Sequence, residues 1–275
     1  MLNIGWFSTG RGPGSRGLLA AAHDEIASGQ LNATITAVFC NRAPGEDENT
    51  DRFLEQVLGY GLPLVSLSSR DFRQRRGEKP VRKGETLPEW RSDYDREAMR
   101  LLEPHHFDIG VLAGYMLIFT ENVLQKYDLL NLHPAAPGGP KGIWQDVIWQ
   151  LIESRAETAG VMIHLATPQL DEGPPVTYCA YPIRGPDFDP LWAQAEGRTI
   201  ENIKATEGET NPLFTEIRRH GGARELPLVI ETLRAFAEAR IRIANKHPAD
   251  TAGSPIPPFD LTPEIERKVT LTAGH

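Results

Sequence analysis

The first half of this chain alternates short apolar runs with longer segments in which apolar residues recur at helical spacing. The apolar runs are continuous rather than interrupted at every second residue, which is typical of parallel strands that are buried on both faces. Strands that alternate with helices in this way predict an α/β fold with a doubly wound, mostly parallel sheet. The expected strands span residues 3–8, 34–40, 64–67, 108–113 and 129–132, and the expected helices between them span 15–28, 50–59 and 93–103.

The second half has a different pattern. A helix is predicted at 144–155, where apolar residues line one face. Two extended runs follow, at 161–166 and 176–183, and a Gly-Pro-Pro turn separates them. We therefore expect these runs to pair antiparallel at the edge of the sheet. Strong helical periodicity returns at 226–243 and predicts a C-terminal helical extension.

Three other segments lack clear periodicity. Residues 70–91 are polar, with many Arg, Lys and Glu, and predict a surface loop. Residues 185–211 are interpreted as an insertion, and the five prolines after residue 246 predict an arm that lies on a surface. The expected division is a core α/β domain at 1–183, an insertion and C-terminal helix packed on it at 184–246, and a Pro-rich tail at 247–275.

Composition narrows the class of protein. The 275 residues carry 29 Lys+Arg and 37 Asp+Glu, a net charge of −8, which argues against a general nucleic-acid binder. Two cysteines, Cys40 and Cys179, are too few for a disulfide scaffold, and both lie in apolar runs. They predict buried free thiols in a reducing cytoplasm. There is no signal-peptide pattern, and no apolar run reaches the roughly 18 residues of a membrane span. We expect a cytoplasmic monomer or homodimer that acts on small molecules, without membrane or nucleic-acid partners.

The candidate chemistry lies at the end of the fifth expected strand. Asn131 and His133 close an apolar run that Pro134 stops, so both side chains project from one side of the strand's carboxyl end. Open α/β sheets place their active sites at that edge. Asp171 follows a later extended run. An amide, an imidazole and a carboxylate that converge at one strand end suit acyl transfer, because two groups can hold an oxyanion and one can handle protons.

These residues belong to a longer motif, NLHP at 131–134 followed by a helix and then LDEGP at 170–174. The motif resembles that of the folate-dependent formyltransferase family. Two further segments are similar to the family, VLAGYM at 111–116 and YDRE at 94–97. The resemblance covers roughly residues 1–183 and is nearest to the phosphoribosylglycinamide (glycinamide ribonucleotide) formyltransferase branch.

The resemblance implies a one-carbon transferase. Its co-substrate would be 10-formyltetrahydrofolate, and the acceptor would be the amine of glycinamide ribonucleotide, a step of purine biosynthesis. His133 and Asn131 would hold the oxyanion, and Asp171 would position water and move protons. The segment 135–143 departs from the family pattern, so another amine, such as an amino sugar nucleotide, stays open as the acceptor. A non-catalytic folate- or nucleotide-binding protein is the alternative from a different class.

The segment 8–17 is rich in glycine and lies between an expected strand and an expected helix. Such a loop is either an anion cradle, because glycines let the backbone approach a phosphate at a helix start, or a tight turn. Ser15 is a candidate cap for that helix. The resemblance implies that Gly12, Gly14, Ser15 and Arg16 bind the phosphate of the acceptor.

The apolar run after the fourth expected strand is core or a pocket wall by composition. The resemblance implies that it lines the folate pocket and that Arg91 reaches the folate. The residues of this expected wall are Met116, Leu117, Ile118 and Phe119.

His164 lies within an apolar run and is either a buried supporting histidine or a direct participant. A metal site formed by His133, His164 and Asp171 would lack any short-spaced ligand pair, so we expect no metal.

Overall fold

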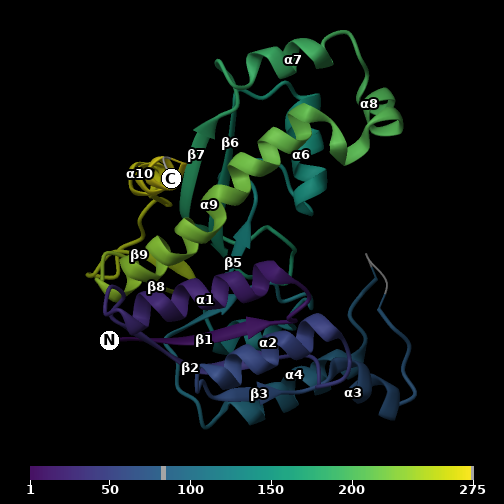
Figure 1. Ribbon diagram of the computed structural model, residues 1–275. Helices are drawn as coiled ribbons and strands as arrows, with labels where there is room; N and C mark the ends of the chain where they lie inside the picture. Colours follow the sequence, from purple (N-terminus) through teal and green to yellow (C-terminus); the bar gives the residue numbers. More distant parts are fainter. Residues whose placement is uncertain (82–84, 274–275) are drawn as a thin grey trace.

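The structure is a computed structural model, and it describes residues 1–81 and 85–273. The described residues form an eight-stranded sheet and a separate two-stranded ribbon, β8–β9. Figure 1 shows how the helices surround the sheet. The strands are β1 (Leu2–Ser8), β2 (Ala33–Cys40), β3 (Leu64–Ser66), β4 (Ile109–Leu112), β5 (Leu129–His133), β6 (Thr158–Leu165), β7 (Pro175–Pro182), β8 (Arg242–Ala244), β9 (His247–Ala249) and β10 (Phe259–Asp260). The helices are α1 (Pro13–Ala27), α2 (Glu48–Gly59), α3 (Ser69–Arg75), α4 (Glu89–Leu102), α5 (Glu121–Lys126), α6 (Trp144–Glu153), α7 (Asp189–Ala195), α8 (Ile200–Thr206), the short η1 (Gly208–Thr210), α9 (Pro212–Ala237) and α10 (Thr262–Ala273).

The strand order, β10-β7-β6-β5-β4-β1-β2-β3, places β1 inside the sheet. The chain builds β2 and β3 on one side of β1 and then crosses to build β4 and β5 on the other. These five strands run parallel, as predicted. The direction in which strands are added reverses between β1 and β4, so the loops that follow these two strands diverge. Open α/β sheets form their ligand crevice at such a switch point.

Strands β6 and β7 add to β5 in antiparallel register, with Met162 opposite both His133 and Tyr178. Their predicted antiparallel pairing is confirmed. Their predicted place at the edge of the sheet is wrong, because β10 pairs parallel with β7 through Phe259 and Thr177. A strand of two residues carries no periodicity from which it could be predicted.

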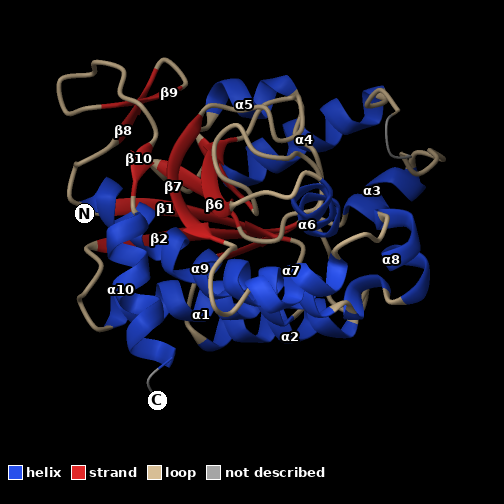
Figure 2. Cartoon of the chain, turned by 90° about the horizontal axis from the view of Figure 1, so that it is seen from above, coloured by secondary structure: helices blue, strands red, loops and turns tan. Residues whose placement is uncertain are grey.

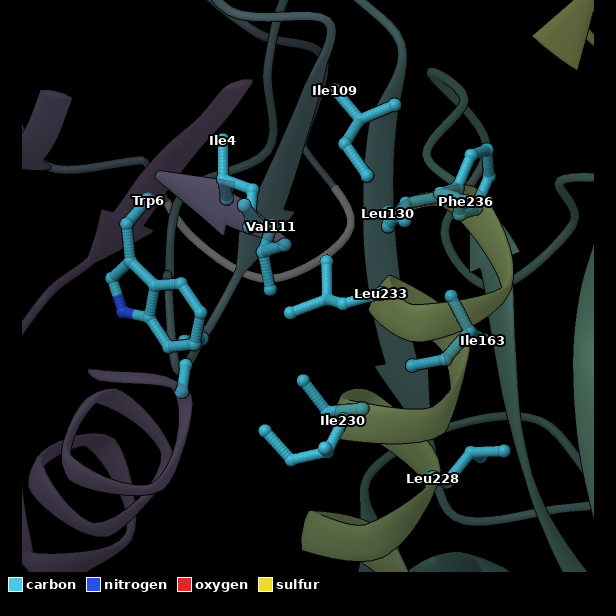
Figure 3. Close-up of a cluster of buried hydrophobic side chains, with 14 of the residues drawn as sticks. Ile4, Trp6, Ile109, Val111, Leu130, Ile163, Leu228, Ile230, Leu233 and Phe236 are labelled. Atoms are coloured by element: carbon cyan, nitrogen blue, oxygen red, sulfur yellow. The ribbon is translucent and has the colours of Figure 1, made fainter. Parts of the chain in front are cut away.

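Helices cover both faces of the sheet, and Figure 2 shows α1, α2 and α9 below it and α4 and α5 above. The lower face packs its apolar side chains against α9, as Figure 3 shows for Ile4, Val111, Leu130 and Ile163. Helix α6 with α7 and α8 encloses a third apolar cluster beyond the end of β5. This packing fixes the carboxyl ends of β1, β4 and β5 relative to one another.

Helix α9 begins at Pro212, well before its predicted start. The Asn211 side chain accepts hydrogen bonds from the backbone N–H groups of Leu213 and Phe214, and Pro212 occupies the first turn. Asn followed by Pro is a strong helix start. The predicted boundary was wrong because Pro227 also resembles a first-turn proline, although it lies inside the helix.

The segment after residue 246 contains more structure than its pattern predicted. Besides β9 and β10 it forms α10, which packs on α9 and β7. The buried Arg224 of α9 donates two hydrogen bonds, of 2.6 and 2.8 Å, to the carboxylate of Glu266 in α10. This bidentate pair depends on residues far apart in sequence, so local periodicity does not reveal it.

The two other aperiodic segments also contain helices. Residues 70–91 include most of α3 and the start of α4, and 185–211 include α7 and α8. The prediction of a surface loop at 70–91 was therefore wrong, and the segment 185–211, which was interpreted as an insertion, is partly helical. Cys40 and Cys179 are buried and free, as predicted. Among the described residues, no helix is both long and apolar enough to cross a membrane.

Substitution of Gly110 in β4 tests how tightly the sheet is packed. A Cβ atom there would lie 2.4 Å from Leu129 Cδ2 and 2.9 Å from Phe7 Cε2. We expect Gly110→Ala to lower the free energy of unfolding by ~1–3 kcal/mol, because side chains on both sides must shift. Urea denaturation measures this change. Gly59→Ala at the exposed end of α2 is the matched control, since open space surrounds its Cβ position, and an equal loss in both variants would contradict the packing argument.

Candidate active site

Three side chains that the sequence singled out meet beyond the carboxyl end of β5. Asn131 and His133 project from the same side of that strand, and the loop between β6 and β7 brings Asp171 to them. His133 Nδ1 lies 3.6 Å from Asp171 Oδ1, and both side chains are more than nine-tenths buried. This separation is too long for a hydrogen bond. The low-dielectric setting nevertheless makes the carboxylate a strong electrostatic partner for a protonated imidazole.

A backbone carbonyl determines which nitrogen of His133 is free. His133 Nε2 lies 2.9 Å from the carbonyl oxygen of Pro140. A carbonyl oxygen only accepts, so Nε2 carries a proton and donates it. In the neutral ring, Nδ1 is then the nitrogen with the lone pair, and it faces Asp171. Protonation of the ring would place its second N–H at Nδ1, beside the carboxylate.

His164, from the neighbouring strand β6, fixes the amide of Asn131. His164 Nδ1 lies 2.8 Å from the Leu165 carbonyl oxygen and must donate to it. Burial lowers the pKa of His164, which favours the neutral ring. Its Nε2 therefore accepts, at 3.1 Å, from Asn131 Nδ2. The second Nδ2 hydrogen and the Oδ1 atom of Asn131 remain for a ligand.

The backbone conformation at residues 171–173 explains why Asp and Gly occupy the first and third positions of the Asp-Glu-Gly segment. Asp171 has a φ of 56°, in the left-handed region that Asp and Asn tolerate better than other side chains. Its Oδ2 accepts a hydrogen bond of 3.3 Å from the backbone N–H of Gly142. A Cβ atom on Gly173 would lie 1.6 Å from the Leu165 carbonyl oxygen, so only glycine fits there.

The glycine-rich loop after β1 ends earlier than predicted. Helix α1 begins at Pro13, its cap is Gly12, and no side chain caps it. The prediction that Ser15 caps this helix is therefore wrong. Open space surrounds the Cβ positions of Gly12 and Gly14, and Arg16 Nη1 makes only long contacts, of 3.4 Å, to Asn49. The first turn of α1 contains no acidic residue, and its backbone N–H groups have no side-chain cap and no partner within the helix, as an anion site requires.

The predicted wall lies on the other side of the switch point. Met116 and Ile118 are 57% and 39% exposed although they are apolar, whereas Phe119 is buried. Arg91 lies buried behind this wall, where its Nη2 donates to the Ile118 carbonyl oxygen at 2.9 Å. Leu117 packs partly against the core. The wall therefore offers an apolar surface, and Arg91 supports it.

Arg91 also lies 3.4 Å from Asp95, which itself accepts from the backbone N–H of Thr120. Burial raises the pKa of Asp95, although the guanidinium of Arg91 acts in the opposite direction. Arg91 Nε has no hydrogen-bond partner among the described residues.

Thr9 joins the loop after β1 to the wall after β4, although no sequence motif marks it. Its hydroxyl donates to Asn41 Oδ1 at 2.7 Å and accepts from the backbone N–H of Met116 at 2.9 Å. Gly114, with a φ of 71°, lies so close to Ser15 that a Cβ atom would be 2.5 Å from the Ser15 hydroxyl. These contacts hold the loop after β1 against the wall after β4. Among the described residues, no group of three His, Cys, Asp or Glu side chains is placed to hold a metal ion.

Comparisons with known proteins point to one family. A family model described as formyl transferase matches residues 12–188. Phosphoribosylglycinamide formyltransferase of Escherichia coli is 28% identical over 174 residues, which are 62% of this chain and 70% of that protein. The enzyme of the same name from Dictyostelium discoideum is 26% identical over 201 residues, 68% of this chain and 90% of that protein.

Solved structures show the same fold. The structure of phosphoribosylglycinamide formyltransferase from Coxiella burnetii has a TM-score of 0.63 at 19% identity, and covers 94% of this chain and 98% of that one. A formyltetrahydrofolate deformylase from Pseudomonas syringae has a TM-score of 0.56 at 18% identity, and covers 90% of this chain and 65% of that one. At these identities the likeness extends to the fold alone.

The neutral state of His164 predicts a pH dependence of stability. Its pKa in the folded chain lies below the ordinary value of 6.5. Above that value the ring is neutral in both states, and as pH falls below it the unfolded chain gains a proton that the folded chain resists. Stability is therefore lost on acidification. We expect the difference in free energy of unfolding between the wild type and His164→Asn to shrink between about pH 7.5 and pH 5. Urea denaturation across this range measures it, and a constant difference would show that the buried ring protonates freely.

Proposed function

This chain belongs to the formyl transferase family, and on that premise we propose that it transfers the formyl group of 10-formyltetrahydrofolate to the primary amine of glycinamide ribonucleotide. The observation that carries the proposal is the meeting of Asn131, His133 and Asp171 beyond the end of β5, on the same sheet edge as the apolar wall after β4 and the start of α1 after β1. One ligand carrying a phosphate and another carrying a flat apolar ring can therefore approach the same three side chains.

The three side chains have complementary tasks in this reaction. Attack of the amine on the formyl carbon moves the carbonyl electron pair onto oxygen and forms a tetrahedral oxyanion. Asn131 donates its remaining Nδ2 hydrogen to that oxygen, and His133 donates from Nδ1 when the ring is protonated. The Asp171 carboxylate, 3.6 Å from Nδ1, would position a water molecule and accept a proton during the transfer. The proton that the amine loses then passes to the departing folate nitrogen, and the carbon–nitrogen bond to the folate breaks.

The wall fits the donor. Met116 and Ile118 expose apolar surface that a pterin ring would cover, and burial of that surface favours binding. Arg91 holds the Ile118 backbone in place, and its unpartnered Nε leaves donor capacity at the back of the wall. No covalent intermediate on the protein is needed, and burial raises the pKa of Cys40 to about 11 and of Cys179 to about 12, so neither thiol is poised as a nucleophile.

The open start of α1 favours a phosphorylated acceptor. Gly12, Gly14 and Arg16 at the start of α1 would bind the phosphate of glycinamide ribonucleotide, and the Ser15 hydroxyl lies against Gly114. Sequence relatives named phosphoribosylglycinamide formyltransferase favour this acceptor. The fold shared with formyltetrahydrofolate deformylases raises a second candidate, hydrolysis, in which water replaces the amine.

A formyl-transfer assay tests the assignment. The purified protein is incubated with 10-formyltetrahydrofolate and, in separate reactions, with glycinamide ribonucleotide, an amino sugar nucleotide or no amine. We expect formylated product only with glycinamide ribonucleotide. Release of formate without an amine would support hydrolysis, transfer to the sugar nucleotide would replace the acceptor, and absence of all three products would refute catalysis.

Asp171→Asn isolates the role of the carboxylate. Asparagine tolerates the left-handed backbone at this position, so the loop keeps its shape while the charge is lost. We expect kcat to fall by about 10²- to 10⁴-fold without loss of the folded state. Glu172→Gln is the matched control, since Glu172 is half exposed and pairs with Lys141. An Asp171→Asn enzyme as active as this control would make Asp171 a turn residue only.

Gly14→Val tests the phosphate site. The new side chain would occupy the open space at the start of α1, and we expect the KM for glycinamide ribonucleotide to rise several-fold with little change in the KM for the donor. Arg16→Ala should act in the same direction but more weakly, because the N–H groups remain. Gly17→Val, one turn further along the helix and equally open, is the control. A rise in the KM of the donor instead would exchange the two half-sites.

A further inference from the structure

A cavity that the proposed reaction does not use lies between α6, α7 and α8. Its volume is about 370 Å³, which is within the range of cavities that hold small ligands. None of the residues placed at the catalytic site lines it. The matched family model ends at residue 188, so α7 and α8 follow it in sequence. Figure 1 shows these two helices beyond α6, at the opposite end of the molecule from β3.

The apolar part of the cavity lining is buried. Ile152 of α6, Trp192 of α7 and Ile203 of α8 line the cavity, and each is less than a tenth exposed. Trp192 Nε1 donates to the Ile183 carbonyl oxygen at 2.6 Å, so the polar group of the indole is already satisfied. A ligand therefore meets an apolar surface here, and burial of its own apolar part favours binding.

Arg184 presents a positive charge that neutral groups hold in place. Its guanidinium group lies over the Trp192 ring, 3.9 Å from the ring centre, and its Nη2 donates to the Arg155 carbonyl oxygen at 2.8 Å. These partners order the group and leave its charge available to a ligand. An ordered guanidinium loses less conformational freedom when it binds a carboxylate through its remaining N–H groups.

Charges of both signs line the cavity without neutralising one another. The unpaired ones belong to Arg155, Arg184, Glu153, Asp189 and Glu196. Among the residues that the structure describes, none of these five side chains forms an ion pair. Arg198 lines the cavity too, but Glu207 neutralises it. The cavity therefore separates positive groups from negative groups, and both lie around an apolar surface.

We propose that this cavity binds a free α-amino acid with an apolar side chain. The α-carboxylate pairs with Arg184, the ammonium group pairs with the carboxylates of the lining, and the side chain covers Ile152 and Ile203. A ligand that carries both charges satisfies both sets of groups at once. A phosphate ester without a positive group would meet the same carboxylates, and repulsion between like charges disfavours it.

NMR of the full chain, labelled at the isoleucine methyl groups, measures binding at the cavity itself. Spectra of Ile152→Val and Ile203→Val assign the two reporting signals. The ligands are alanine, valine, leucine, methionine and phenylalanine. We expect leucine to bind with a Kd on the order of 0.1 mM. Alanine should bind at least ~10-fold more weakly, because each buried methylene group favours binding.

Two analogues of leucine separate the two charges. Leucinamide lacks the carboxylate, and isocaproate lacks the ammonium group. We expect each to bind ~10-fold more weakly than leucine, since each loses one charge-assisted contact.

Two variants identify the partners of those charges. Arg184→Gln should reduce the preference for leucine over leucinamide to near one, because no guanidinium remains for the carboxylate. Its matched control is Arg267→Gln, which removes an exposed guanidinium that also donates to a backbone carbonyl oxygen, that of Pro263. The double variant Glu153→Gln, Glu196→Gln should instead reduce the preference for leucine over isocaproate.

The proposal expects each preference to fall only in the variant that lacks the matching charge. Unchanged preferences in both variants would overturn it, and so would the absence of a saturable shift of the two methyl signals with all five amino acids. A shift caused by inorganic phosphate and not by leucine would also overturn it, because the cavity would then be an anion site. Formyl transfer is measured separately, so failure of either proposal leaves the other standing.

Discussion

The hydrogen bond from His133 Nε2 to the Pro140 carbonyl oxygen determines what the site can do. It fixes the ring, assigns the proton to Nε2 and turns Nδ1 toward Asp171. If the ring turned over, Nδ1 would face a backbone acceptor and the carboxylate would lie beside the wrong nitrogen. The oxyanion donor in our mechanism exists only in the observed orientation. Pro140 contributes through its main chain, and Gly138 and Gly142 in the same loop have φ values of 78° and 111°, in which glycine is favoured.

The sheet positions the other parts of the site. The strand order separates the loops after β1 and β4 at the switch point, and β5 lies beside β4. Thr9 then reconnects the separated loops through the backbone of Met116. His164 of β6 also acts across two elements, because it orients Asn131 of β5 through a hydrogen bond. Each proposed catalytic group is therefore held by a neighbour on another element, which lowers the cost of reaching the reactive geometry.

The sequence predicted the parts of this structure that have local causes. Buried parallel strands are continuous apolar runs, and Asn131, His133 and Asp171 belong to a motif whose spacing reflects one strand end and one turn. The start of α9 also had a local signal, Asn211 before Pro212, but Pro227 resembled a second start. The roles of Pro140, Thr9 and Arg224 had no local signal. Each depends on a contact between residues that the fold brings together. For Pro140 the contacting atom is the backbone carbonyl oxygen, which every residue type has.

Nitrogen NMR of the histidine rings tests the central claim most directly. In protein labelled with ¹⁵N at histidine, two-bond couplings identify which ring nitrogen carries the proton, and spectra of His133→Asn and His164→Asn assign the signals. At about pH 8, where an ordinary histidine is neutral, the structure predicts the Nε2–H form for His133 and the Nδ1–H form for His164. An Nδ1–H form of neutral His133 would contradict the account, because the ring would then not be held by Pro140 and its lone pair would not face Asp171.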